Sequence, residues 1–166
     1  MTNPTIRSAM AADRKAVRAI YPLAFPDEDL LALLSTMWEA PADRPTEFVA
    51  TVGTNIVGHV AYSPCSAEGA RVWLLGPLAV HPDHQQQGLG TALIRAGAGA
   101  QGGVILVLGD PAYYSRHGFR TETAIQPPYA LPQEWLGAWQ SIGADGALTG
   151  TLSVPEYWRD PALWGR

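Results

Sequence analysis

The chain has 166 residues, 47% of them hydrophobic and 16% charged, and a formal net charge of −4. This composition is typical of one globular domain rather than a disordered chain, and so acidic a chain lacks the basic face of a general nucleic-acid-binding protein. The single cysteine, Cys65, excludes an internal disulfide and argues against a cysteine metal site. We therefore expect neither a nucleic-acid partner nor a metal.

Nothing in the sequence directs the chain to a membrane. The first residues, MTNPTIRSAMAADR, lack the apolar core of a signal peptide. No apolar run approaches the ~18 residues that a membrane span needs. We expect no membrane partner and a cytoplasmic location.

The first part of the chain predicts one strand and two helices. Residues 4–7 suit a short strand, and the apolar spacing from Met10 to about Phe25 predicts a helix. Asp27 is expected to cap a second helix, DEDLLALLSTMWEA, which the prolines after it end.

The middle of the chain predicts strands around one helix. EFVATV and IVGHVAYS, joined by a GTN turn, predict a β-hairpin. After an AEGA turn comes the apolar strand RVWLLGPLAV, in which Gly76 and Pro77 indicate a bulge or a splayed edge. A helix is expected from Gly88 to Ala100, followed by the short strand GGVILVLG.

The last third of the chain gives weaker signals. PAYYSRH predicts a short helix that Gly118 ends. Beyond it, four tryptophans punctuate weak elements: Trp135, Trp139, Trp158 and Trp164. The order of elements predicts a mixed α/β fold with too few helices for a doubly wound sheet.

The segment HPDHQQQGLGTALI carries two glycines just before the expected helix. Glycines at such a place let the main chain approach a ligand closely, often a phosphate. A triphosphate site of the Walker type needs a lysine that is absent here. A dinucleotide site would use Gly88, Gly90 and Asp110, but Leu93 stands where a third glycine belongs and the loop after Val80 is too long.

A pyrophosphate cradle suits the segment better. The loop from Gln85 to Gly90 can turn its N–H groups inward, and the helix N-terminus adds about half a positive charge. Because the loop side chains are glutamines, the main chain would supply most of the anion binding. The alternative is that the two glycines only begin a helix.

With these residues the chain resembles the GNAT superfamily of N-acetyltransferases, in its YhbS-like bacterial branch. Gln85 to Gly90 fit the family's acetyl-CoA signature, Arg/Gln-x-x-Gly-x-Gly/Ala, throughout. PLAVHPDHQQQGLGTALI is similar to the family's fourth strand and pyrophosphate loop, and GDPAYYSRHGF to its Tyr-x-x-x-Gly-Phe segment. Residues 72–120 carry the resemblance within one acetyltransferase domain over 1–166, and it is faint in the C-terminal part, 121–166.

The resemblance implies a mixed α/β fold: a central mixed, mostly antiparallel sheet with a splayed parallel strand pair, flanked by helices. Acetyl-CoA would lie between the splayed strands, expected at 74–80 and 104–109. The fourth strand would bind the pantetheine arm and the loop amides the pyrophosphate. The cofactor-binding residues so implied are Leu78, Ala79, Val80, Gln85, Gln86, Gln87, Gly88, Leu89, Gly90 and Thr91.

The resemblance also implies direct attack of a primary amine on the acetyl-CoA thioester in a ternary complex. The amine must arrive neutral, although an alkyl ammonium has a pKa of about 10.4, and a proton donor helps the thiolate to leave. By the resemblance that donor is Tyr114, four residues before the glycine of Gly-Phe. Tyr113 is its rival, and either ring could instead be a core aromatic.

The general base is not visible in the sequence. Many members of the family carry a glutamate on the fourth strand, but RVWLLGPLAV has none. By chemistry alone the candidates are Glu68, His59, His81 and His84, of which His59 is favoured as a structural residue. A base acting through water is an equal alternative.

The family's acceptor site usually lies among the first two helices and the C-terminal strands. Aromatic residues there are Tyr21, Phe25, Trp38, Tyr62, Trp135 and Tyr157. They would line a pocket for a small-molecule or peptide amine, or form the core. Homodimers are common among relatives. Two alternative functions remain: a non-catalytic acyl-CoA-binding or regulatory module, and an NAD-dependent enzyme.

Overall fold

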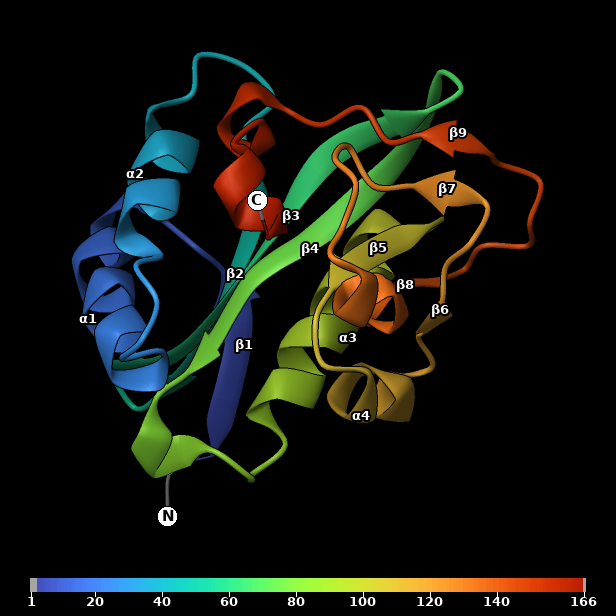
Figure 1. Cartoon of the computed structure of the whole chain (residues 1–166). Coiled ribbons are helices and arrows are strands. Elements are labelled where there is room, and N and C mark those ends of the chain that lie inside the picture. The colour runs from blue at the N-terminus through green and yellow to red at the C-terminus, as the bar shows by residue number, and fades with distance from the viewer. Residues whose placement is uncertain (1–2, 166) are drawn as a thin grey trace. The chain divides into compact units, whose positions relative to one another are not determined.

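The computed structural model describes residues 3–165 of the chain (Figure 1). The chain divides into two compact units. The N-terminal unit comprises the residues up to Tyr62 together with Pro77–Ala100, and the C-terminal unit comprises Ser63–Gly76 together with the residues from Gln101 onward.

Within residues 3–165, the N-terminal unit holds three antiparallel strands, the end of a fourth strand and three α-helices. Strand β1 pairs with β2, and β2 pairs with β3 across a two-residue turn in which Gly53 has a φ of 62°. Such turns need positive φ, which explains the glycine. The elements are β1 (Pro4–Ser8), α1 (Arg14–Ala24), α2 (Leu31–Glu39), β2 (Thr46–Val52), β3 (Asn55–Ala67), the end of β4 (Ala70–Val80) and α3 (Leu89–Gln101).

Helices cover both faces of the strands in this unit. Helices α1 and α2 lie side by side (Figure 1), and Arg18 of α1 donates a hydrogen bond to Ser35 of α2. Their buried apolar side chains form one cluster with Val49 of β2 and Ala79 of β4. Helix α3 packs against Gly58 and Tyr62 of β3. Because His59 contacts α1 instead, and neighbouring residues of a strand point to opposite faces, α3 covers the other face.

The C-terminal unit is built around the parallel pair β4 and β5. The parallel register runs from Trp73–Ile105 to Leu75–Val107. Strand β8 pairs antiparallel with β5 and with β6, while β7 and β9 form a separate parallel pair. The elements after α3 are β5 (Ile105–Leu108), α4 (Pro111–Tyr114), β6 (Arg120–Thr121), β7 (Ile125–Gln126), β8 (Trp139–Ile142) and β9 (Gly150–Thr151). The fold is therefore mixed α/β with mostly antiparallel pairing, as predicted.

The tryptophan-rich tail forms much of the core of this unit. Trp139 and Trp164 are buried and meet edge to face, and the Trp139 indole N–H donates to the Ile125 carbonyl. The Trp164 indole N–H donates to the carbonyl of Trp158, whose own indole N–H donates to Ser63. These residues replace regular elements with side-chain packing, which is why the sequence signal there was weak.

Most of the predicted elements are confirmed, but the start of the second helix was wrong. Helix α2 begins at Leu31, and Asp27 does not cap it. Instead the chain turns at Phe25, whose carbonyl accepts from Glu28 N–H, and Asp29 accepts a hydrogen bond from Leu31 N–H at 3.1 Å. The carboxylate nearest the helix made this contact, since an Asp side chain reaches the N–H group two residues later. Within residues 3–165, no helix is long and apolar enough to cross a membrane.

Candidate active site

The glutamine-glycine loop between β4 and α3 has the geometry of an anion cradle. Gln86 and Gly88 both have positive φ, 62° and 80°. Such alternation turns successive N–H groups toward one side of the chain. The residues from Gln85 to Gly88 are exposed, and α3 begins directly after them at Leu89.

The N–H groups of this loop lack partners of their own. Within residues 3–165, no protein acceptor pairs with the N–H groups from Gln86 to Thr91, and the first helical hydrogen bond runs from Ala92 N–H to the Gly88 carbonyl. These donors point out of a helix N-terminus, where the helix dipole adds partial positive charge. The loop can therefore receive an anion through its main chain.

The side chain of Gln85 does not extend this donor set. Its Nε2 donates a hydrogen bond of 3.0 Å to the carbonyl of Val80, the last residue of β4. His81 N–H in turn donates to the Val57 carbonyl of β3. The start of the loop is thus tied back to the strand that precedes it.

The residues predicted to bind the pantetheine arm lie at the end of β4. Ala79 is buried in the cluster beneath α1 and α2, whereas Leu78 and Val80 are half-buried. Just before them Gly76 has a φ of 150°, which L side chains rarely adopt. Strand β4 runs through Gly76 and Pro77 without a break, and the bulge or splayed edge expected there stays a prediction.

Tyr114 lies at the end of α4 in the C-terminal unit and is half-buried. Its ring packs edge to face on Phe119, with centroids 5.5 Å apart, and its carbonyl accepts from Phe119 N–H. Tyr113 meets Tyr114 edge to face at 5.0 Å, and burial raises the pKa of Tyr113 although Arg116 opposes the shift. A 3₁₀ turn, Ser115–His117, follows α4, and Gly118, with a φ of 91°, ends that turn.

The four candidate bases have different surroundings. His59 is fully buried. His81 accepts a hydrogen bond from Asp83 N–H at its Nδ1, and Glu68 sits in the β3–β4 turn and accepts one from Thr149. His84 is half-buried and packs edge to face on His81. His59 therefore stands apart from the other three.

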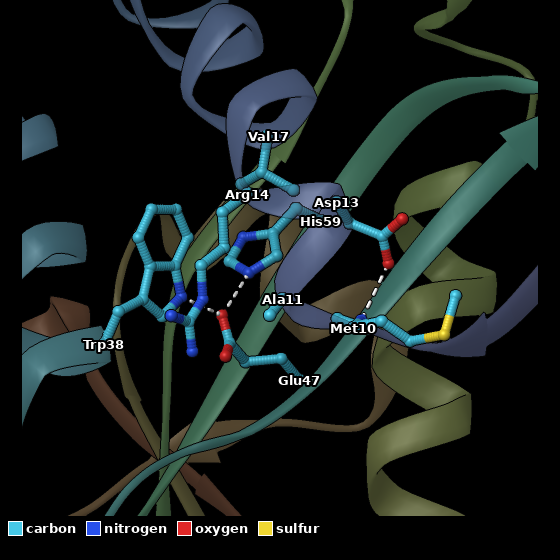
Figure 2. A pocket seen from close by; sticks show the side chains of 9 residues that line it. Met10, Ala11, Asp13, Arg14, Val17, Trp38, Glu47 and His59 are labelled. Atoms are coloured by element: carbon cyan, nitrogen blue, oxygen red, sulfur yellow. Dashed lines mark hydrogen bonds and ion pairs between the residues drawn. The ribbon is translucent and has the colours of Figure 1, made fainter.

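His59 belongs to a chain of hydrogen bonds that includes a glutamate which the sequence analysis missed. Its Nδ1 lies 2.7 Å from the Tyr21 hydroxyl, and its Nε2 lies 2.7 Å from Oε1 of Glu47. The indole N–H of Trp38 donates to the same Oε1 at 2.9 Å. Figure 2 shows Glu47 receiving both contacts at one side of a pocket.

That pocket is a cavity of about 60 Å³ in the N-terminal unit. Glu47 comes from β2, His59 from β3, Trp38 from α2 and Arg14 from α1, so four elements meet at it (Figure 2). Its lining residues are Ala9, Met10, Ala11, Asp13, Arg14, Val17, Trp38, Glu47 and His59.

A sequence signal for Glu47 did exist. In β2 it alternates with Val49, which is fully buried, so the carboxylate lies on the apolar face of the strand. Val49 pairs directly with His59, and Glu47 pairs with Ala61, so Glu47 and His59 are diagonal neighbours. A charged residue on the buried face of a predicted strand was the sign to follow.

Comparison with known proteins decides the family. The Acetyltransferase (GNAT) domain profile matches residues 43–121. The uncharacterized N-acetyltransferase YjhQ of Escherichia coli is 31% identical over 158 residues, covering 85% of this chain and 86% of YjhQ. The chain belongs to the GNAT acetyltransferase family.

Solved GNAT structures agree with this assignment. The YhbS N-acetyltransferase of Escherichia coli, crystallised with CoA, superposes with a TM-score of 0.86 at 25% identity, covering 100% of this chain and 97% of YhbS. A GNAT acetyltransferase from Brucella melitensis, in complex with acetyl-CoA, gives a TM-score of 0.73 at 25% identity, covering 95% of this chain and 99% of its own. The predicted resemblance to the YhbS-like branch is confirmed.

The structure also gives the surroundings of Asp110 and of the aromatic residues that were candidates for the acceptor site of this GNAT chain. Asp110 caps α4 by accepting a hydrogen bond from Ala112 N–H at its Oδ1. This structural role explains the acidic residue that a dinucleotide site would have used to bind a ribose. Of the aromatic candidates for the acceptor site, Tyr21, Tyr62 and Tyr157 are buried and Trp38 lines the cavity. Within residues 3–165 there is no cluster of His, Cys, Asp and Glu side chains that could hold a metal.

Proposed function

We propose that this GNAT acetyltransferase uses acetyl-CoA to acetylate a primary amine by direct attack in a ternary complex. The observation that carries the proposal is the loop from Gln86 to Thr91, whose N–H groups have no protein acceptor within residues 3–165. The CoA and acetyl-CoA complexes of the YhbS and Brucella proteins support it.

The cradle would bind the pyrophosphate and the main chain from Leu78 to Val80 the pantetheine arm. Because the Val80 carbonyl already accepts from Gln85, the remaining main-chain groups of this segment would make the contacts. The side chain of Gln85 then acts as a positioning group that holds the loop against β4, rather than as a ligand of the phosphate.

Tyr114 would donate the proton that the leaving thiolate needs. A phenol of ordinary pKa, about 10, is protonated at neutral pH and can serve as a general acid. The amine nitrogen forms the new bond to the acetyl carbon, the carbon–sulfur bond breaks, and the thiolate takes the proton of Tyr114. The proton that the nitrogen loses passes through water and restores the phenol. We propose that residues 1–166 work as one acetyltransferase domain. We propose a cytoplasmic location for it, which suits a chain whose single cysteine, Cys65, is buried.

Ligand binding tests the cradle directly. The purified chain is titrated with acetyl-CoA, CoA and NADH while thermal unfolding is recorded. A ligand present at 100 times its Kd stabilises the folded state by about 2.7 kcal/mol. We expect a raised Tm with acetyl-CoA and CoA and none with NADH; a shift with NADH alone would favour a dinucleotide enzyme.

A matched pair of glycine variants separates the cradle from backbone strain. Gly88 and Gly53 both have positive φ, and a Cβ at either position meets no other atom within 4 Å. Alanine at each should cost about 1–2 kcal/mol of stability for the left-handed conformation. Only Gly88→Ala should weaken acetyl-CoA binding, measured by calorimetry, because only that loop would touch the ligand. Equal Kd values for acetyl-CoA in the two variants would show that the loop does not contact the ligand.

Turnover distinguishes an enzyme from a binding module. Release of CoA thiol is followed with a panel of primary amines. Acetyl-CoA binding without release on any amine would instead support the non-catalytic acyl-CoA-binding module.

A further inference from the structure

The cavity of Figure 2 carries two opposite charges that do not neutralise each other. Glu47 and Arg14 both line it, yet within residues 3–165 no ion pair joins them. The other carboxylate at the cavity, Asp13, is already held by Arg7 through two hydrogen bonds of 2.7 and 2.9 Å. One carboxylate and one guanidinium thus remain for a ligand.

The carboxylate of Glu47 is held with one oxygen occupied and the other available. Trp38 Nε1 can only donate, so Oε1 is an acceptor there, and His59 Nε2 must carry the proton that it shares with the same oxygen. The other ring nitrogen of His59, Nδ1, lies 2.7 Å from the Tyr21 hydroxyl, so both ring nitrogens have hydrogen-bond partners. Within the described part of the chain, no donor pairs with Oε2.

The guanidinium of Arg14 is held beside this carboxylate. It lies over the Trp38 ring, 5.4 Å from the ring centroid, and no carboxylate among residues 3–165 pairs with it. Figure 2 shows its side chain descending from α1 toward the side of the pocket where Trp38 and Glu47 lie. The stacked arrangement restrains the cation and leaves its N–H groups able to bind an anion.

We propose that this cavity binds the head group of an amino-carboxylate acceptor, such as a free α-amino acid. Its amine would donate to Oε2 of Glu47 and its carboxylate would bind Arg14. A cavity of about 60 Å³ admits the charged head, so the side chain of the acceptor would remain outside. The inference rests on the proposed acetylation of a primary amine and names the class of amine.

Matched acceptors test the requirement for the carboxylate. Phenylalanine, phenylalaninamide and phenethylamine share one ring and one amine but differ in the carboxylate, and the same comparison is repeated with leucine and methionine. We expect kcat/KM at least ten times higher for the amino acids than for their amides or decarboxylated amines. An equal or reversed order would overturn the proposal.

Two substitutions assign the charges to their residues. Arg14→Gln should abolish the preference for the carboxylate, and Glu47→Gln should lower kcat/KM for every amine. Arg18→Gln serves as the control, because Arg18 lies on the same helix but binds Ser35 outside the cavity. A preference that persists in Arg14→Gln would contradict the assignment, as would unchanged kinetics in Glu47→Gln.

Direct binding keeps this inference separate from the proposed function. The Kd of acetyl-CoA should be the same in all three variants, and calorimetric binding of the preferred amino acid to the CoA complex should weaken at least tenfold in Arg14→Gln. If acetyl-CoA does not bind the native chain, the proposed function itself fails. If acetyl-CoA binds but no amino acid is bound or acetylated, only the acceptor class is wrong.

Discussion

The ring of Tyr114 lies against Gly109, so closely that a Cβ at Gly109 would collide with the Cε2 atom of the ring. Tyr114 N–H donates to the Asp110 carbonyl at 3.0 Å, and the ring packs on Phe119 from another side. The place of the proposed acid is therefore set by the absence of a side chain at the end of β5. The position of the Tyr114 ring is thus fixed from three sides, by Gly109, Asp110 and Phe119.

Gly109→Ala should displace the Tyr114 ring and lower kcat while leaving the Kd of acetyl-CoA unchanged. Gly137→Ala is the control, because a Cβ there meets nothing within 4 Å. Stopped-flow or steady-state thiol release gives kcat, and calorimetry gives Kd. Normal turnover in Gly109→Ala would show that the ring position does not matter to the reaction.

Tyr114→Phe should reduce kcat by up to ~10²–10⁴-fold, the usual range for loss of a general acid, with acetyl-CoA binding preserved. Tyr113→Phe, on the same turn of helix, should change kcat far less. If Tyr113→Phe shows the larger loss, the roles of the two phenols are exchanged.

Alanine substitutions at two glycines of α3 should change the free energy of unfolding in opposite directions. A Cβ at Gly97 would collide with the buried Tyr62 ring, whose hydroxyl donates to the Ile94 carbonyl at 2.9 Å, whereas a Cβ at Gly99 meets open space. Gly99→Ala should raise the free energy of unfolding by about 0.5–1 kcal/mol through helix propensity. Gly97→Ala should lower it by roughly 1–3 kcal/mol through overpacking. Urea denaturation of both variants measures the difference, and the same sign for both would contradict the packing of α3 on β3.

Asp13 should make the free energy of unfolding depend on pH. Hydrogen bonds from Arg7, more than any other contact, lower the pKa of the Asp13 carboxyl below its ordinary 3.8, against the opposing effect of burial. A lowered folded-state pKa means that the stabilisation is complete above the ordinary value and is lost as pH falls through the lowered one. Asp13→Asn should cost about 1–3 kcal/mol at pH 7 for the charge-assisted bonds.

The acid titration has a simple control. The cost of Asp13→Asn should shrink toward zero as pH falls below 3.8. Asp27→Asn, at an exposed side chain, is the control for the substitution itself. A cost of Asp13→Asn that does not vary with pH would show that the carboxylate is not selectively stabilised in the folded chain.

Local chemistry made much of the fold predictable. The turns at Gly53 and Gly69 need positive φ, so glycine marked both ends of β3. The start of α2 was misplaced because no side chain caps this helix: its N-cap residue is Leu30, and Asp29 binds Leu31 N–H from one position earlier. The C-terminal core could not be foreseen, because its tryptophans are held by partners distant in sequence, such as Trp158 on Ser63.

The candidate site also has one part that the sequence predicted and one part that it did not. The loop from Gln85 to Gly90 is continuous in sequence, so its glycines and the helix after it could be read together. Glu47 was missed because it becomes notable only once β2 and β3 pair and bring it to His59. The register of a hairpin, and not the spacing of residues along the chain, creates that pair.

The glutamines of the cradle have a consequence for how the chain would respond to salt. Gln85 directs its amide to the Val80 carbonyl, and Gln86 and Gln87 bring no formal charge to the loop. A phosphate held by fixed peptide dipoles at short range is screened far less by mobile ions than one attracted by lysine or arginine side chains at the surface. The affinity for acetyl-CoA should therefore vary little with ionic strength, so that the cradle would bind equally well in dilute and in concentrated electrolyte.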